Sequence, residues 1–277
     1  MIPTKSRFQV DNRKIVIFGA GKIGRSFIGQ LFGTAGYKVV FVDTDRLLTA
    51  LINERKCYRV VAKSEREETI VVRNVSAIDA ADVPAVGEAV STAGIVAVSV
   101  GKNAVEKVVP MIADGLKLRH DRFPGQPLDI IIAENMISGR DFMEENLKKF
   151  LPPEFPLNEM TGLVETSIGK MVPIMSQSDL EKDPLQVFAE PYNILILDKK
   201  GFRTPIPQIK GLAPKENIKA WVDRKAFIHN LGHATAAYYG YYLHPESAYM
   251  YEVLNDAKVS GFTREVMMQA AEILIEA

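Results

Sequence analysis

The chain has 277 residues, 47% of them hydrophobic and 25% charged, and its 34 basic residues balance 34 acidic ones. This length predicts one large domain or two modest ones, with a substantial core. A net charge of zero gives no indication of a nucleic-acid or membrane surface, and no run approaches the ~20 apolar residues of a membrane span. The single cysteine, Cys57, excludes an internal disulfide framework, and we interpret it as a bystander thiol.

Both ends of the chain carry information about its context. Residues 1–14 are polar and lack the apolar core of a signal peptide, so we expect a cytoplasmic protein. Residues 262–277 have the pattern of an amphipathic helix that reaches the last residue without a capping glycine. This pattern predicts a fragment, or a chain from which further sequence is missing.

Residues 14–43 have the order strand, glycine turn, helix, strand, acid. The apolar run Ile15–Phe18 leads into Gly19, Gly21 and Gly24, which fit G-x-G-x-x-G. A helical pattern follows, and a second β-rich run, Val39–Val42, ends at Asp43. This order predicts a Rossmann-type nucleotide-binding unit.

Each glycine of this turn has a physical task in dinucleotide binding. Gly19 takes the tight turn out of the strand, Gly21 lets the backbone approach a pyrophosphate, and Gly24 lets the helix pack closely. The first turn of the helix offers unpaired N–H groups and the positive end of a dipole. We therefore predict that the cofactor is bound by Gly19, Ala20, Gly21, Lys22, Ile23, Gly24, Asp43 and Gly101.

Asp43 lies about 20 residues past the last glycine, where an acid accepts hydrogen bonds from a ribose 2′-hydroxyl. A carboxylate there would repel a 2′-phosphate, which favours NAD over NADP, although Arg46 is close enough in sequence to soften that preference. The alternative is a doubly wound domain that has lost its cofactor.

The following segment predicts further parallel strands and an insertion. Residues 46–55 have a helical pattern, and residues 58–75 predict a hairpin inserted in the nucleotide domain. Residues 79–93 are ambiguous, with a helix favoured. The apolar runs 95–100 and 130–133 are typical of buried parallel strands, and a helical pattern separates them.

Ligands of open parallel sheets bind at the carboxyl ends of strands. We therefore expect Gly19, Asp43, Ser99–Gly101 and Glu134–Asn135 to line one crevice. From residue 151 the composition changes to a proline-rich segment, and helical patterns dominate after Pro214. The sequence thus predicts a doubly wound, mostly parallel sheet in residues 1–190 and a mainly helical domain, truncated at its end, in residues 191–277.

A second group of polar residues lies on the helix predicted from about residue 215. Lys225, Asn230 and His233 have the spacing K-x4-N-x2-H, which at ~100° per residue confines them to a sector of roughly 140°. The helix is apolar nearly all round, which is typical of a buried helix. Burial lowers the pKa of an amine and makes it a competent general base.

Two other interpretations of this group stay open. Lys225 could reach solvent while His233 is a hydrogen-bonded core histidine. His229 and His233 are spaced i, i+4, which would allow a metal pair, but no cluster of acids accompanies them and we expect no metal site.

Three segments carry a resemblance to a known family. Residues 17–29, Glu134-Asn135-Met136 and residues 224–234 together resemble the mannitol dehydrogenase family, the polyol-specific long-chain dehydrogenases. The similarity extends from about residue 14 to residue 260. It implies an NAD-dependent, metal-independent hydride transfer and a helical C-terminal domain longer than the one present here.

The resemblance also implies residue roles. Lys225 would be the general acid/base, Asn135 and Asn230 would donate hydrogen bonds to the substrate oxygen, and His233 would orient the substrate. The expected substrate is a polyol or sugar phosphate, with mannitol 1-phosphate and fructose 6-phosphate favoured. Mannitol 2-dehydrogenase or hexuronate reductase activity is the alternative, and a non-catalytic NAD-binding protein is the alternative of another class. We expect a monomer or a weak homo-oligomer.

Two departures from the family bear on the substrate. Relatives tend to read V-D-R-I-V-P where this chain has Ile168–Pro173, so an acid is lost and a lysine, Lys170, replaces an arginine. The shorter length is the second departure. A phosphate needs a basic pocket, for which Lys170, Arg203 and Lys210 are candidates, with solvated surface charges as the alternative interpretation.

Overall fold

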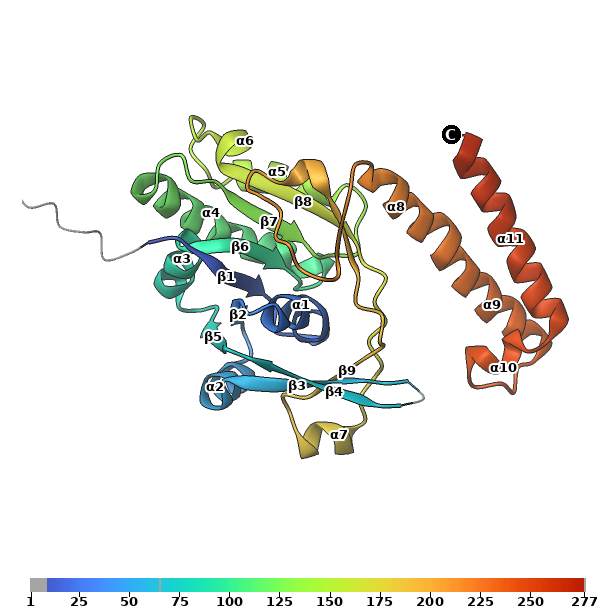
Figure 1. Ribbon diagram of the computed structural model, residues 1–277. Coiled ribbons are helices and arrows are strands. Elements are labelled where there is room, and N and C mark those ends of the chain that lie inside the picture. The colour runs from blue at the N-terminus through green and yellow to red at the C-terminus, as the bar shows by residue number, and fades with distance from the viewer. Residues whose placement is uncertain (1–8, 65, 277) are drawn as a thin grey trace, which may run out of the picture. The chain divides into compact units, whose positions relative to one another are not determined.

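The computed structural model describes residues 9–64 and 66–276 and divides into two compact units, Met1–Glu216 and Asn217–Ala277 (Figure 1). The expectations for the first eight residues and for the last one, Ala277, lie outside the described residues.

The first unit is built on a sheet of eight strands in the order β11-β10-β8-β7-β6-β1-β2-β5. All neighbours are parallel except β8 and β10, which are antiparallel. The strand order reverses at β1, which has β2 on one side and β6 on the other. The predicted Rossmann-type sheet is confirmed; its strands are β1 (Asp11–Phe18), β2 (Lys38–Asp43), β5 (Val75–Asp79), β6 (Ala93–Val98), β7 (Leu128–Ile132), β8 (Thr161–Ser167), β10 (Leu195–Asp198) and β11 (Leu212–Lys215).

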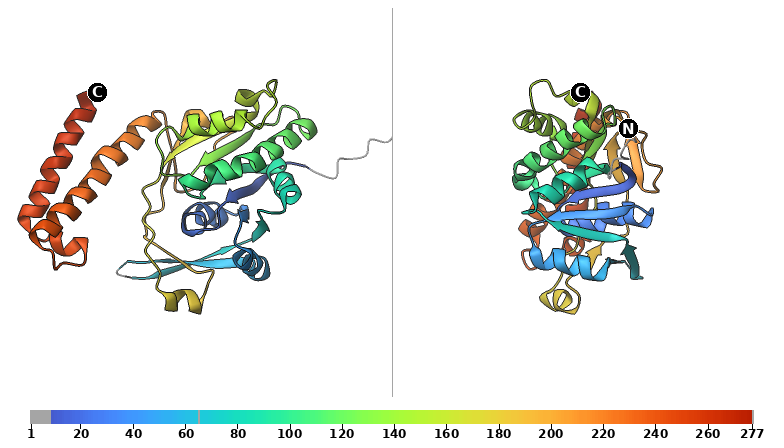
Figure 2. Two further views of the ribbon diagram at one scale, coloured as in Figure 1. Left: turned by 180° about the vertical axis from the view of Figure 1, so that it is seen from behind. Right: turned by 90° about the vertical axis from the view of Figure 1, so that its left-hand side faces the viewer.

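Both faces of this sheet are covered, which explains its near-continuous apolar strands. Along β1, Ile15 and Ile17 join one core, while Val16 and Phe18 join the other. Helices α3 (Val83–Ser91), α4 (Val105–Arg122) and α5 (Gly139–Lys148) pack on the second core. The first core is covered by the helix after the glycine turn and by a smaller sheet, and Figure 2 shows these layers from behind and from the side.

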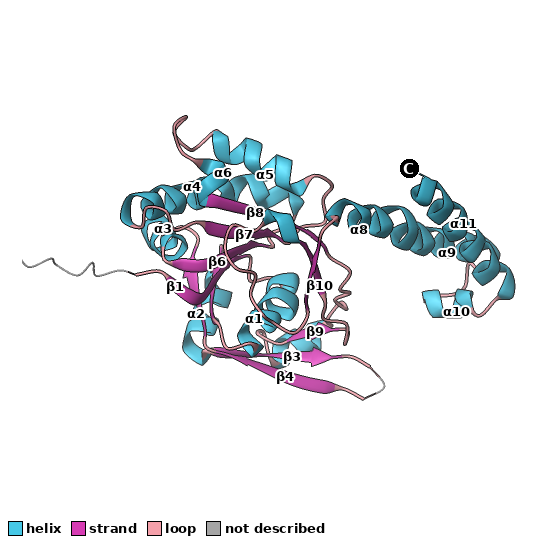
Figure 3. Ribbon diagram, turned by 45° about the horizontal axis from the view of Figure 1, so that its top comes forward, coloured by secondary structure: helices cyan, strands magenta, loops and turns pink. Residues whose placement is uncertain are grey.

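The smaller sheet contains the predicted hairpin, β3 (Cys57–Ala62) and β4 (Glu68–Arg73), and a third strand, β9 (Val187–Ala189). It lies apart from the large sheet, with α1 (Gln30–Thr34) near it (Figure 3). The hairpin ends earlier than expected, because Asn74 has a φ of 58° and turns the chain. The next residues form β5 of the large sheet instead.

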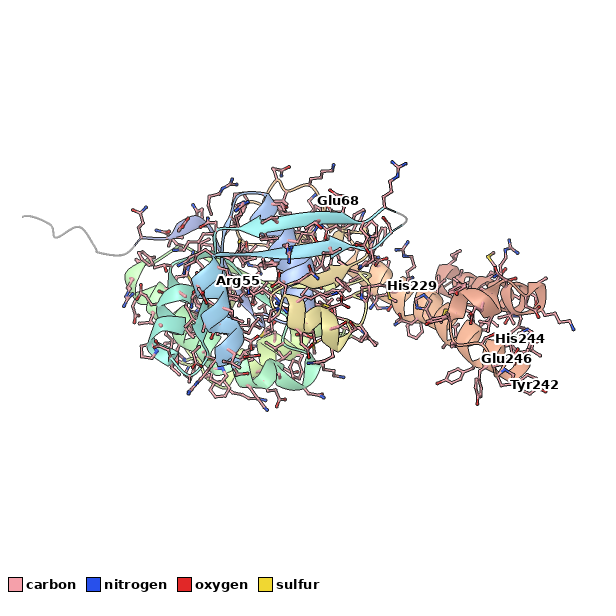
Figure 4. The ribbon with its side chains drawn as sticks, turned by 90° about the horizontal axis from the view of Figure 1, so that it is seen from below. Arg55, Glu68, His229, Tyr242, His244 and Glu246 are labelled. Atoms are coloured by element: carbon pink, nitrogen blue, oxygen red, sulfur yellow. The ribbon has the colours of Figure 1, made fainter. Side chains whose placement is uncertain are left out.

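Two arginines fasten the segment that leads into β9. Asp183 accepts hydrogen bonds from Arg55 at 2.6 Å and from Arg59 at 2.9 Å. Arg55 is the last residue of α2 (Arg46–Arg55), a helix with the bounds that the sequence predicts (Figure 4). These contacts between residues distant in sequence join the segment before β9 to α2 and to β3.

The first unit extends beyond residue 190, where composition had placed the domain boundary. Residues 195–198 are buried because β10 pairs with β8 on one side and with β11 on the other. The large sheet therefore retains the chain as far as Glu216. The remaining helical segments among the described residues of this unit are η1 (Gly24–Gly29), η2 (Lys102–Ala104), α6 (Leu157–Met160), α7 (Gln177–Lys182) and η3 (Lys199–Gly201).

The second unit is helical, with α8 (Ile218–Arg224), a π-helical turn η4 (Lys225–His229), α9 (Asn230–Leu243), α10 (Met250–Leu254) and α11 (Ala257–Glu276). At the end of α9, His244 lies 2.7 Å from Asp256, and Figure 4 labels His244, Glu246 and Tyr242 there. In the described part of the chain, no helix has the length and apolar character needed to cross a membrane.

The prediction that the helix carrying Lys225 is buried in a core is wrong for this structure. Within α9 only Gly232, Ala236 and Gly240 are buried. A Cβ on Gly232 would lie 2.5 Å from the sulfur of Met267, so α11 covers this side of α9 closely. Tyr238, on another side, is 79% exposed. This helix is therefore covered on one side and not buried all round.

Candidate functional site

The three glycines of the turn differ in the space around them. Gly19 has a φ of 94°, and a Cβ there would lie 2.4 Å from the carbonyl oxygen of Ser99. A Cβ on Gly24 would lie 2.0 Å from the carbonyl oxygen of Gly19, whereas one on Gly21 would meet nothing within 4 Å. Two glycines are therefore required by the protein itself, and the third faces open space. This arrangement fits a pyrophosphate that approaches the backbone at Gly21.

The helix after the turn is anchored by residues that the sequence analysis missed. It contains a π-helical segment, η1 (Gly24–Gly29). The hydroxyl of Tyr58 donates to the Arg25 carbonyl at 2.8 Å, and a Cβ on Gly29 would lie 2.4 Å from that hydroxyl. The buried Arg25 guanidinium donates to the Leu185 carbonyl at 2.9 Å, and burial lowers its pKa. The small sheet thus holds the start of the helix in place.

Asp43 clamps the glycine turn to the end of β2. Its Oδ2 accepts from the Ala20 N–H at 2.6 Å, and its Oδ1 accepts from the Asp45 N–H at 2.9 Å. A carboxylate offers about four lone-pair positions, so acceptor capacity remains for a ribose hydroxyl. Asp43 therefore has a structural task in addition to the predicted one.

A cavity of about 650 Å³ lies at the carboxyl ends of these strands. It brings together Gly19, Asp43, Ser99 and Val100, which were predicted to share one crevice, and it also includes Gly21 of the glycine turn. Several other lining residues were not predicted from the sequence. Some of them reach the cavity because β5 lies beside β2 in the sheet. The further lining residues are Phe18, Val42, Thr44, Arg46, Asp79, Ala80, Ala81, Ala104, Lys107, Val108 and Met111.

The other residues predicted for the crevice are arranged beside it. Gly101 has a φ of 87°, and its N–H donates to Oε1 of Glu134 at 2.8 Å. Burial raises the pKa of Glu134. Asn135 follows as an exposed residue. Gly101, Glu134 and Asn135 do not line the cavity, and neither do Lys22 and Ile23.

In the second unit, the π-helical turn changes the geometry predicted for Lys225 and Asn230. The N–H of Asn230 donates to the Lys225 carbonyl, which is an i→i+5 bond. In an α-helix these residues would lie ~140° apart around the axis. In a π-turn, residue i+5 takes the place that i+4 has in an α-helix, so the two lie on the same side. His233 follows three residues later and is a surface neighbour of Asn230.

The three side chains differ in exposure. Lys225 is half-buried, and burial lowers the pKa of its amine, which is the direction that a general base requires. Asn230 and His233 are exposed, and the His233 ring lies 4.5 Å from the His229 ring, centroid to centroid. No group of three His, Cys, Asp or Glu residues suited to a metal ion is found in the described ranges.

The candidate phosphate ligands divide into two kinds. Lys170 is 6% exposed, so the surface interpretation is wrong for it. Its amine donates to Asn193 at 2.8 Å and to Gln30 at 3.3 Å, and burial lowers its pKa to about 8. Lys170 therefore joins the segment after β8 to Gln30 and Asn193. Arg203 and Lys210 are exposed.

A family model described as the mannitol dehydrogenase Rossmann domain matches residues 13–211 of the chain. The chain belongs to the mannitol dehydrogenase family. The predicted family is confirmed, and with it the class of enzyme, a dehydrogenase, at the level of the family.

Relatives within the mannitol dehydrogenase family are similar over most of this chain. A mannitol-1-phosphate 5-dehydrogenase of Brevibacillus brevis is 34% identical over 94% of the chain and 66% of its own length. One of Lactococcus lactis subsp. lactis is 31% identical over 95% of the chain and 68% of its own length. The chain thus spans about two thirds of the length of the relatives it matches.

The similarity to solved structures concerns only the fold. An octopine dehydrogenase with NADH and L-arginine superposes with a TM-score of 0.54 at 12% identity, over 81% of this chain and 52% of that one. A UDP-glucose dehydrogenase of Pyrobaculum islandicum gives 0.52 at 10% identity, over 92% of this chain and 57% of that one.

Proposed function

We propose that this chain carries the NAD-binding and catalytic residues of a polyol phosphate dehydrogenase that interconverts mannitol 1-phosphate and fructose 6-phosphate. The observation that carries the proposal is the glycine turn, in which Gly19 and Gly24 have no room for a side chain while Gly21 faces open space. The names of the relatives support the substrate, since both relatives described above are mannitol-1-phosphate 5-dehydrogenases.

The first unit supplies the residues that would hold NAD. The N–H groups of the helix that begins after Gly21 would bind the pyrophosphate. Asp43, at the end of β2, would accept a hydrogen bond from a ribose hydroxyl. Gly101, held by Glu134, lies on the next loop of the same edge. Bound NAD would supply the acceptor for the hydride.

The second unit supplies the proton acceptor. The half-buried Lys225 amine would take the proton of the substrate hydroxyl, while the hydrogen on the same carbon leaves with its electron pair as hydride. In the reverse direction, protonated Lys225 would return that proton to the keto oxygen. Asn230 and Asn135 would donate hydrogen bonds to the oxygen as negative charge develops, and such a donor is worth ~3 kcal/mol at a transition state. His233 would orient the substrate.

The remaining expectations form part of this proposal. Catalysis would need no metal, and the protein would act in the cytoplasm on a small molecule, as a monomer or weak homo-oligomer. A free polyol or a hexuronate remains the alternative substrate, because residues 168–173 depart from the family pattern and Lys170 is committed to Asn193 and Gln30.

Two measurements on the full chain test the proposal. Titration with NADH, followed by its fluorescence, tests cofactor binding without requiring turnover. Reduction of the cofactor is then measured with mannitol 1-phosphate, with mannitol and with a hexonate, as NADH formed from NAD and as NADPH formed from NADP. We expect binding of NADH and turnover of mannitol 1-phosphate with NAD. No NADH binding would refute the cofactor assignment, and turnover of mannitol but not of its phosphate would refute the substrate.

A further inference from the structure

Two carboxylates end neighbouring strands at the cavity. Asp43 is the last residue of β2 and Asp79 the last residue of β5, and these two are direct partners in the parallel register. Adjacent strands lie about 4.8 Å apart, so the two side chains start from neighbouring positions at the same edge. Both line the cavity. The acid predicted to select the dinucleotide therefore has a second acid beside it.

The backbone holds Asp79 in place, as it does Asp43. Oδ1 of Asp79 accepts from the Ala81 N–H at 2.9 Å. Its Oδ2 accepts from Nε of Arg46, also at 2.9 Å. One carboxylate oxygen is thus fixed by the loop after β5, and the other holds an arginine that lines the same cavity.

Arg46 is the cation that the sequence placed near enough to Asp43 to soften the preference for NAD. Its side chain is 78% exposed, and such exposed ion pairs contribute little to stability. Stability is therefore a weak reason for the pair. Arginine is also a strong partner of phosphate groups, because its planar guanidinium donates two parallel hydrogen bonds.

We propose that Asp79 is a second determinant of dinucleotide selection, a proposal that rests on the proposed function. Asp79 acts in two ways: it adds a negative charge beside Asp43, and it holds Arg46, which would otherwise be available to a 2′-phosphate. With Arg46 counted, the three groups carry a net charge of −1. Loss of Asp43 alone leaves Asp79 in place and Arg46 held, so it does not by itself open the site to NADPH.

The test compares the affinities of NADH and NADPH by fluorescence titration of the full chain. The variants are Asp43→Asn, Asp79→Asn, the double variant, and the double variant with Arg46→Ala. We expect Asp79→Asn to shift the ratio of affinities towards NADPH roughly three- to tenfold at low salt. The double variant should exceed the product of the single effects, and Arg46→Ala should remove most of that gain. The shifts should shrink at high ionic strength, because salt screens exposed charges.

Asp82→Asn is the matched control. Asp82 lies three residues from Asp79 and caps α3 by accepting from the Ala85 N–H at 3.1 Å, but it does not line the cavity. Its substitution removes the same charge nearby and should leave the ratio of affinities unchanged.

The outcomes separate the two proposals. If the wild type binds neither dinucleotide, the proposed function fails and this inference with it. If the wild type binds NADH but Asp79→Asn shifts the ratio no more than Asp82→Asn does, the inference alone is wrong. If Asp43→Asn fails to fold, Asp79→Asn with and without Arg46→Ala decides, since the gain should again depend on the arginine.

Discussion

The two units position their candidate residues in different ways, the first through its backbone and the second through side chains on a helix. In the first unit, the turn from Gly19 to Gly24 is fixed by backbone contacts, and Asp43 accepts a hydrogen bond from one main-chain N–H group of that turn, that of Ala20. In the second unit, Lys225, Asn230 and His233 depend on how a helix is wound. A site built from backbone is therefore visible in a sequence motif, whereas a site built from side-chain alignment depends on details that the motif does not show.

The strongest test of this comparison is removal of the amine in the second unit. Lys225→Ala should lower turnover by roughly 10²–10⁴-fold, because a positioned general base contributes about that much. NADH affinity should stay near that of the wild type, since the proposed cofactor site lies in the first unit. Steady-state rates and NADH titration check both halves of the prediction.

Lys219→Ala is the control for that change. Lys219 is a lysine of α8 whose side chain is 83% exposed and paired with Asp223. It should leave the rate unchanged. A Lys225→Ala rate similar to that of Lys219→Ala would remove Lys225 from the mechanism.

The second prediction separates binding from folding within the glycine turn. Gly24→Ala should destabilise the first unit by about 2–3 kcal/mol, because its Cβ would overlap the Gly19 carbonyl and the backbone must shift. Gly21→Ala should leave the unfolding midpoint unchanged, because its Cβ meets nothing, yet weaken NADH binding about tenfold. Denaturant unfolding and NADH titration of both variants test this; equal effects of the two on stability would contradict it.

The fold was largely predictable from the sequence for a physical reason. Buried parallel strands such as Ile15–Phe18 need apolar residues on both faces, and glycines are needed where a Cβ has no space. Asn74, in contrast, gives no strong sign that the hairpin ends there, and β10 and β11 gain their partners only in the folded sheet. Contacts between residues distant in sequence, such as Arg25 with Leu185, leave no local pattern.

The candidate site was predictable to a smaller extent. The glycines and Asp43 follow from spacing, but Asp79 becomes part of the cavity only through the pairing of β5 with β2. The K-x4-N-x2-H spacing is visible in the sequence, but the angles predicted from it apply only to an α-helix. The π-turn adds one residue to that turn, which a pattern with a fixed angle per residue does not detect.

The third prediction tests the winding of that helix. Deletion of Ala226 should convert the π-turn into an α-helical turn, in which Lys225 and Asn230 become i, i+4 and stay on the same side. Deletion of Leu231, between Asn230 and His233, should rotate His233 by ~100°. We expect the first deletion to lower turnover less than about tenfold and the second about 100-fold, as misplacement of catalytic groups does.

Circular dichroism of both deletion variants checks that helical content is kept. Each variant loses one residue from the same helical segment, so the pair is its own control for length. Equal losses of turnover would show that the π-turn does not set the alignment of Lys225 with Asn230.

The smallest expected effect concerns two lysines whose pKa values are both lowered by burial, one in each unit. The Lys170 amine donates to two amide oxygens, whereas Lys225 is the proposed general base. A lowered pKa alone therefore does not identify a catalytic group. In the folded protein the pKa of Lys170 is about 8, against 10.5 for the unconstrained side chain. Between these values the unfolded chain binds more protons than the folded one, so stability rises with pH through this window.

Lys170→Met should remove that contribution while filling similar space. The unfolding free energy of the wild type should rise relative to the variant by on the order of 1 kcal/mol between pH 8 and pH 10.5. Lys14, whose pKa burial also lowers to about 8, contributes a similar slope to both proteins and cancels in the difference. Parallel pH profiles would mean that Lys170 is protonated alike in the folded and unfolded states. Its hydrogen bonds to Asn193 and Gln30 would then offset the cost of burying its charged amine. Of these two lysines, only the one in the second unit would have a pKa that burial lowers.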